Sequence, residues 1–432
     1  MPFNRQRLVR ALSVYGAGFA VVAIAGAALA LASRTAGPPN VYAKKVLVAN
    51  RHGFEDGAII DRHLVNPWGI ALRPPGIGGH FWISNSGNLS SSTYVGDAKG
   101  VPLHQDGLKI VYLDGPKISY EDGLANVTGV VYNAASDVPG QPVEFPVKGP
   151  ASNLSGASPM SIGTSSGSAK FVFVTTDGTI NAWRSGTAES MNTAVIVKDY
   201  SDHGPHQIKS LPHLPAFTGV AMTTVPHAGN RLYVTDFENA TVRVLDNEWN
   251  DITASVPFAR PAGLAPEMSP YNIQLLNNRL YVTYAVVDVN GEEAATDVPG
   301  AGAGRVVAYD FDGHILQEFK DAGRLNSPWG MAIAPKNFGP FSGALLVANF
   351  GDGTIAAFDL ATGAFRDYLR DKTGAPVVED GVWGLAFGNG VSLGDADSLY
   401  YTAGPNGEQD GVFGRLRYVG PSHTTDKSVT QK

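Results

Sequence analysis

The sequence predicts an all-β fold, a six-bladed β-propeller whose ring is closed by an N-terminal strand that completes the last blade. Three observations predict it. A Trp-Gly phrase recurs as NPWGIALRPP, NSPWGMAIAP and GVWGLAFGNG, beginning at residues 66, 326 and 381. Short alternating strand patterns separated by Gly-rich turns fill the chain. Almost no 3.6-residue periodicity follows residue 32, which argues against a helical repeat.

Composition sets the class of protein. The chain has 432 residues, 44% of them apolar and 16% charged, with 51 glycines and no cysteine. Such a chain can bury a large core without disulfides or thiolate metal sites. A net charge of −7 and a pI near 5.8 offer no basic face for a phosphate backbone, so no nucleic acid partner is expected.

The N-terminus has the pattern of an export signal. Arg5, Arg7 and Arg10 precede an uncharged apolar run over residues 11–32. Residues 1–43 are therefore interpreted as a signal peptide or an N-terminal membrane anchor with its linker, and both alternatives stay open. Either one predicts an extracytoplasmic protein, periplasmic or secreted, with possible tethering through residues 11–32.

The rest divides into a propeller domain over residues 44–420 and a disordered tail over 421–432. Six copies of a strand unit occupy the propeller, each with an apolar strand opened by Gly, a strand of the type LYVT, and a third of the type GTIAAFD. Steps of 60, 90, 53, 58 and 54 residues separate the equivalent positions Gly69, Gly129, Gly219, Asn272, Gly330 and Gly384. These steps suit propeller blades with some long loops.

The glycines and the chain ends fit the same architecture. Innermost strands crowd around a narrow channel, and a residue without Cβ lets their backbones approach closely. The last copy ends near Tyr418 after its third strand, while KKVLVANR at 44–51 is a strand without a partner in its own copy. We expect this strand to complete the sixth blade.

Several stretches carry a family resemblance: FVFVTTDGTINAW, PYNIQLLNNRLYVTYA, DVPGAGAGRV, LNSPWGMAIAPKNFGPFSGALLVANFGDGTIAAFD and LYYTAGPNGEQDGVFG. Together they resemble an uncharacterised family of exported bacterial six-bladed β-propeller proteins, distantly similar to NHL-repeat and gluconolactonase-like propellers. The resemblance covers about residues 60 to 418. It implies the fold but no catalytic residue, because propellers serve as enzymes and as binding scaffolds.

Polar residues end several second strands, and they are the candidate metal ligands. These are Asn85, Asp177, Asp236 and Asn349, with Asn406 a weaker match. If they converge on one face of the ring, their oxygens suit Ca²⁺ or another divalent cation in the central channel, as the gluconolactonase-like resemblance implies. The alternative is that they start turns and accept backbone N–H groups.

Trp68, Trp329 and Trp383 each precede the Gly of an innermost strand and are the candidate ligand-binding residues. Three indoles could stack on a sugar or an aliphatic chain at a pocket mouth. They could equally pack between blades, each with a partner for its N–H.

Two kinds of insertion offer further candidates. His203, His206 and His213 lie in a loop at 200–215 and could bind Zn²⁺ or stay solvated. Long insertions occupy 86–126 and 133–170, and the second, rich in Gly, Pro and Ser, could cover a channel mouth or a side of the ring.

Two functions remain. One is a monomeric binding or scaffold module for an extracytoplasmic glycan, peptide or envelope component. The alternative is a divalent-metal-assisted hydrolase or lyase of the lactonase-like type, with Asp177 or Asp236 as general base. No nucleophile elbow, phosphate loop or zincin motif appears, so whether the protein is an enzyme stays open.

Overall fold

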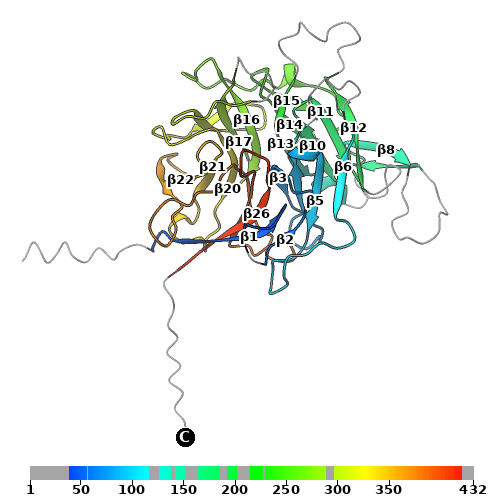
Figure 1. Cartoon of the computed structure of the whole chain (residues 1–432). Helices are drawn as coiled ribbons and strands as arrows, with labels where there is room; N and C mark the ends of the chain where they lie inside the picture. Colours follow the sequence, from blue (N-terminus) through cyan, green and yellow to red (C-terminus); the bar gives the residue numbers. More distant parts are fainter. Residues whose placement is uncertain are drawn as a thin grey trace, which may run out of the picture.

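The computed structural model describes residues 38–55, 57–115, 126–137, 142–150, 164–184, 192–201, 215–226, 229–288 and 296–420 (Figure 1). The described residues form an all-β structure, with only short 3₁₀ turns at Ser86–Asn88, Ala134–Asp137, Thr253–Ser255 and Gly339–Phe341. None of their helices is long and apolar enough to cross a membrane. The predicted signal or anchor run, the C-terminal tail, and His203, His206 and His213 lie outside the described residues.

Three sheets are antiparallel meanders that follow the chain order. The first sheet contains β13 (Phe217–Val225), β14 (Gly229–Asp236) and β15 (Thr241–Leu245). The second contains β16 (Met268–Leu276), β17 (Arg279–Val286), β18 (Gly304–Tyr309) and β19 (Ile315–Glu318). The third contains β20 (Pro328–Ile333), β21 (Leu345–Asn349), β22 (Ile355–Phe358) and β23 (Phe365–Tyr368). Each sheet corresponds to one predicted copy.

The first two copies share one eight-stranded sheet. Its members in order are β3 (Pro67–Ala71), β4 (Phe81–Asn85), β5 (Ser90–Tyr94), β6 (Ile110–Leu113), β12 (Thr193–Asp199), β11 (Thr179–Trp183), β10 (Phe171–Thr175) and β7 (Val127–Tyr132). The outer strands β6 and β12 join the two halves by a short parallel pairing, Thr193 opposite Tyr112. A separate hairpin, β8 (Pro146–Pro150) with β9 (Thr164–Ser168), lies within the predicted insertion.

The last sheet combines both ends of the described chain. β24 (Val382–Phe387), β25 (Ser398–Ala403) and β26 (Val412–Tyr418) are followed by β1 (Tyr42–Ala49) and the two-residue β2 (Ile59–Ile60). β1 runs antiparallel to β26, from Tyr42 opposite Tyr418 to Ala49 opposite Val412, and the two lie side by side in Figure 1.

Many central strands are buried on both faces, which explains their continuous apolar runs. In β10, Phe171 and Phe173 enter one core cluster while Val172 and Val174 enter the next. Because successive side chains of a strand point to opposite faces, each sheet packs against a neighbour on both sides. Outermost strands such as β19 alternate between half-buried and exposed residues instead.

The innermost strands meet around a common axis. β3, β7, β13, β16, β20 and β24 contact one another in that order, and β24 in turn contacts β3. At the last of these junctions, a Cβ on Gly384 would stand 2.4 Å from the carbonyl oxygen of Trp68. This cyclic arrangement of antiparallel sheets is that of a β-propeller.

Candidate functional site

The three predicted tryptophans meet at the centre of the ring. The indoles of Trp68 and Trp383 stack with their centroids 3.6 Å apart, and Trp329 meets both edge-on at 5.7 and 6.0 Å. Phe350 stacks on the other side of Trp383 at 3.9 Å, and Tyr271 meets Trp68 and Trp383 edge-on. We call Trp68, Trp329, Trp383, Tyr271, Phe237 and Phe350 the central aromatic cluster.

The members of the cluster are packed against one another. The tryptophans are at most 6% exposed. Trp329 Nε1 donates to the carbonyl of Thr218, and Trp383 Nε1 donates to Asn66 Oδ1, both at 3.0 Å. Trp68 Nε1 is buried without a hydrogen-bond partner among the described residues. The structure therefore brings these residues together, while their role in ligand binding stays a prediction.

A cavity of about 290 Å³ occupies the ring beyond this cluster, toward the C-terminal ends of the innermost strands. Trp329 is the one indole in its wall, and Ile70, Val130, Val220, Leu275 and Leu385 are among its other lining residues. None of the described lining residues carries a charge. We call this cavity the central channel.

Two amide side chains line the channel, and both bond to the ring itself. Asn272 Nδ2 donates to the carbonyl of Trp329 at 2.8 Å, and Gln274 Oε1 accepts the backbone N–H of Met331 at 2.6 Å. Because these amides hold the junction between β16 and β20, much of their hydrogen-bonding capacity is already used. The aliphatic side chains of the wall offer contacts to an apolar group, and polar atoms share the channel surface with them.

A groove continues from the channel mouth. A second cavity of about 290 Å³ shares Ile70, Gln274, Leu275 and Leu385 with the channel and adds Met331, Ile333 and Phe387. Leu275 is 37% exposed at this mouth, which leaves its side chain in contact with solvent. Channel and groove are thus continuous, and none of the described residues that line them carries a charge.

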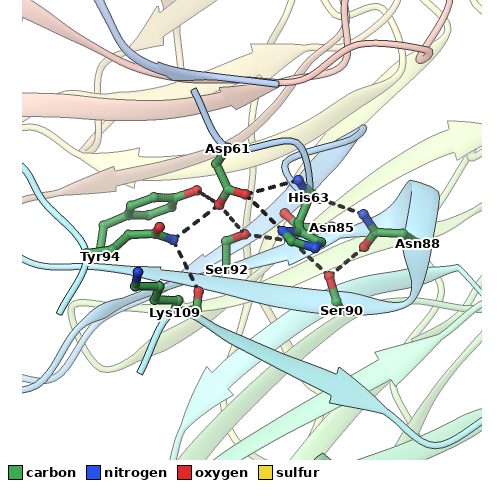
Figure 2. Close-up of polar contacts among 9 residues, drawn as sticks. Asp61, His63, Asn85, Asn88, Ser90, Ser92, Tyr94 and Lys109 are labelled. Carbon is green, nitrogen blue, oxygen red and sulfur yellow. Dashed lines mark hydrogen bonds and ion pairs between the residues drawn. The ribbon is translucent and has the colours of Figure 1, made fainter. Parts of the chain in front are cut away.

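Asn85 belongs to a buried polar network (Figure 2). Its Nδ2 donates to the hydroxyls of Ser90 and Ser92, both at 3.0 Å, and Ser92 Oγ donates to Asp61 at 2.9 Å. Asp61 also accepts hydrogen bonds from Tyr94 OH at 2.5 Å and from the backbone N–H of His63 at 3.0 Å. Burial, with Asp61 alongside, raises the pKa of Tyr94 well above its usual range.

Two more predicted metal ligands are engaged in turns. Asp236 accepts bonds from Arg243 and Asn239, and its side chain is fully buried. Asn349 accepts the backbone N–H of Asn326 and donates to the carbonyl of Arg324. Each is followed by a phenylalanine, Phe237 or Phe350, that enters the central aromatic cluster.

Asp177 has a different environment. Burial, and next the nearby carboxylate of Asp199, raise its pKa to about 6. Asp177 Oδ2 and Asp199 Oδ2 are both buried without a hydrogen-bond partner among the described residues. A carboxylate with a pKa near neutrality can exchange protons at physiological pH.

Asn85, Asp236 and Asn349 thus bond to separate partners. The weaker match Asn406 is exposed at a turn, where its N–H donates to Asp380. Within the described residues, no three His, Asp or Glu side chains gather closely enough to hold a metal ion. The oxygens of Asp177 and Asp199 best fit the donor chemistry of a divalent cation. The metal site stays a prediction.

Sequence reasoning missed the lining of the channel and the role of Asp61. The lining residues follow the recurring Gly positions within the copies, for example Ile70 after Gly69 and Leu385 after Gly384, so the repeat itself carried that signal. Asp61 could have been found from the run SSSTY at 90–94, because hydroxyls buried in a strand need acceptors.

No protein-family model matches the chain. Three similar proteins are called uncharacterized proteins of Acanthamoeba polyphaga mimivirus. R648 is 28% identical over 373 residues, 86% of this chain and 78% of the relative. L690 is 35% identical over 44% of this chain, and R640 is 30% identical over 52%. The chain spans only 49% and 39% of the length of these last two.

Solved structures with a similar backbone include three enzymes, each 12% identical to this chain. Virginiamycin B lyase from Staphylococcus aureus has a TM-score of 0.42 and covers 88% of this chain and 100% of its own. The GH93 α-L-arabinofuranosidase of Fusarium graminearum has a TM-score of 0.43 with 88% and 98% coverage. A glucose dehydrogenase has a TM-score of 0.42 with 83% and 98% coverage. The predicted bacterial, NHL-like family stays a prediction.

Proposed function

We propose that the protein is an exported six-bladed β-propeller that binds an extracytoplasmic ligand by accommodating an apolar group in the central channel. The observation that carries this proposal is the channel itself: about 290 Å³ of space bounded by Trp329 and aliphatic side chains, with no charge on its described lining. Pockets of this size and character are typical of small-molecule sites.

Six blades closed by the N-terminal strand are part of the proposal. The cyclic contacts of β3, β7, β13, β16, β20 and β24 support the number, and the pairing of β1 with β26 supports the closure. Because β1 pairs with β26, strand β26 has no unpaired edge where the ring closes. The innermost strands then surround the channel on all sides.

The location follows from the N-terminal pattern. Arg5, Arg7 and Arg10 before the apolar run 11–32 support export, with the ring as a monomer outside the cytoplasm. A glycan, peptide or envelope component is then the natural ligand. Among these, one with an apolar group fits the channel best, because each CH₂ transferred from water contributes about 0.8 kcal/mol.

The test is binding of N-phenylnaphthylamine, a neutral apolar dye that fluoresces in apolar surroundings. We expect saturable binding to the wild type and a loss of at least about tenfold in affinity for Leu275→Asp, since a carboxylate at the mouth would have to be desolvated. Leu316→Asp is the matched control, because Leu316 is also an exposed strand leucine, at 47%, but lies on β19 away from the channel. Equal binding by all three proteins would argue against the channel.

A second candidate function is a metal-assisted hydrolase or lyase, and the pKa of about 6 at Asp177 favours it. In this alternative Asp177 acts as general base, and Asp199 beside it would help to hold the divalent cation, which would polarise a carbonyl. Elemental analysis and melting curves with and without EDTA test it. A stoichiometric divalent ion whose removal lowers the melting temperature supports this alternative, and a metal-free protein insensitive to EDTA contradicts it.

A further inference from the structure

A separate cavity lies at the seam where the N-terminal strand pairs with the last strand. It has a volume of about 360 Å³ and shares no lining residue with the central channel. Its walls come from β1, β2 and β26, which lie together in Figure 1, and from the loop after β5. We call it the seam cavity.

Three cationic side chains line the seam cavity from one face of the strand pair. Lys45 on β1 lies directly opposite Arg415 on β26, and Arg417 lies two residues further along β26. Opposite positions of an antiparallel pair share a face of the sheet, as do residues two apart on one strand. Like charges placed in this way repel one another, so they require negative charge nearby.

Two carboxylates supply that charge to the arginines alone. Arg415 Nη1 bonds to both carboxylate oxygens of Asp97, at 2.6 and 2.5 Å, and Arg417 Nη2 bonds to Asp395. Among the described residues, Lys45 Nζ has no ion pair or hydrogen bond, and Arg415 Nε and Nη2 have no acceptor. The lining therefore carries three positive charges against two negative ones.

Two other carboxylates near β1 are engaged elsewhere. Glu55 Oε2 accepts the backbone N–H of Val46 at 2.6 Å, and Glu379 pairs with Lys44 at 2.6 Å. Neither glutamate lines the seam cavity, so neither balances the charge of Lys45.

The wall opposite the strand pair is fixed before any ligand binds. Asp97 and Lys99 have positive φ angles of 52° and 51°, which cost free energy in residues with a side chain. Such conformations persist where the surroundings hold them. Here Tyr400 OH donates to Asp97 Oδ2 at 2.5 Å, and the N–H of Lys99 donates to Asp395 at 3.3 Å.

We propose that the seam cavity is a second binding site, for a small organic carboxylate whose charged group lies between Lys45 and Arg415. The apolar part of this ligand packs against Leu47, Ile59 and Leu103. The free donors of Arg415 suit a carboxylate, and because Arg415 is only 13% exposed, solvent screens its charge weakly. This site does not depend on ligand binding in the central channel.

The experiment is titration with benzoate, benzyl alcohol and benzylammonium at pH 7.5, followed through the aromatic NMR signals of each probe. The three probes have similar size and differ in charge. For the wild type we expect saturable binding of benzoate, at least about tenfold tighter than benzyl alcohol, since hydrogen bonds to charged groups are the stronger ones. Benzylammonium should bind most weakly. Equal affinity for benzoate and benzyl alcohol, or tighter binding of benzylammonium, would overturn the proposal.

Lys45→Gln should weaken benzoate binding by about three- to fivefold, the upper range for an exposed charge pair, and leave benzyl alcohol binding unchanged. Lys45 is exposed and unpaired among the described residues, so its replacement leaves the fold intact. Lys320→Gln is the matched control, because it removes the same charge from an exposed lysine just after β19. Unchanged benzoate affinity in Lys45→Gln would overturn the proposal. Benzoate binding that Leu275→Asp abolishes and Lys45→Gln preserves would place benzoate in the central channel, which overturns the seam site and supports the proposed function.

Discussion

The indoles of Trp68 and Trp383 stack face to face at the centre of the ring, with centroids 3.6 Å apart. They come from β3 and β24, the first and last of the innermost strands, so this contact joins the two ends of the propeller. Trp383 is sandwiched between Trp68 and Phe350. The central aromatic cluster fills the ring at the strand starts, and the central channel lies beyond it.

Gly384→Ala should destabilise the ring. A Cβ there would stand 2.4 Å from the carbonyl oxygen of Trp68, and this backbone atom cannot move without shifting β3. We expect a loss of about 1–3 kcal/mol, as for other overpacked sites. Denaturant unfolding of Gly107→Ala serves as the control, because a Cβ on Gly107 meets nothing within 4 Å. Equal stability of the two variants would contradict close contact between β24 and β3.

Replacing single indoles by Phe should separate packing from hydrogen bonding. All such variants lose the same volume, but only Trp383→Phe and Trp329→Phe remove a hydrogen bond. Trp68 Nε1 has no partner among the described residues. Trp68→Phe should therefore lower the free energy of unfolding by about 1–2 kcal/mol less than Trp383→Phe does. The difference arises because Trp383→Phe leaves Asn66 Oδ1 without its hydrogen-bond donor. A larger loss for Trp68→Phe would show that its N–H has a partner in solution.

Asp236→Ala should destabilise by about 3–5 kcal/mol, because it leaves the Arg243 guanidinium without its buried partner. The Asp236 side chain is fully buried, and its Oδ2 lies 2.8 Å from Arg243 Nη2. Asp312→Ala is the matched control, since Asp312 forms its ion pair with Arg231 while 60% exposed. Thermal unfolding of both variants measures the difference, and a cost below that of the control would contradict the buried pair.

Asp177→Asn should change the pH dependence of stability. The pKa of Asp177 is raised by burial to about 6 in the folded protein, so the folded state holds a proton that the unfolded chain releases at lower pH. The wild type therefore loses stability as the pH rises from about 4 to about 6. At pH 7, Asp177→Asn should be more stable than the wild type by about 1–2 kcal/mol, after allowance for partial solvent screening. Parallel stability profiles for the two proteins across this range would contradict the raised pKa.

The repeat unit could be predicted because local backbone geometry requires particular residues at fixed positions of each copy. Gly at the first-strand position is required by the neighbouring backbone, as Gly384 and Trp68 illustrate, and hairpin glycines such as Gly353 have positive φ. The parallel pairing of β6 with β12 could not be predicted, since it joins residues far apart in sequence that form short, half-exposed strands.

The candidate site was only partly predictable. The sequence identified Trp68, Trp329 and Trp383 as a set, but it could not tell whether their rings point outward or at one another, because that depends on the ring diameter. The sequence makes Asn349 a candidate metal ligand, and the structure shows that its amide also bonds to the backbone of Asn326 and Arg324.

Ligand binding in the central channel is tested most directly by a crystal structure of the protein grown with 10-bromodecan-1-ol, in which anomalous scattering locates the bromine. We expect one strong bromine peak inside the central channel, bounded by Trp329, Val130 and Leu385. A channel filled only with ordered water, or a bromine bound elsewhere on the protein, would contradict binding in the channel.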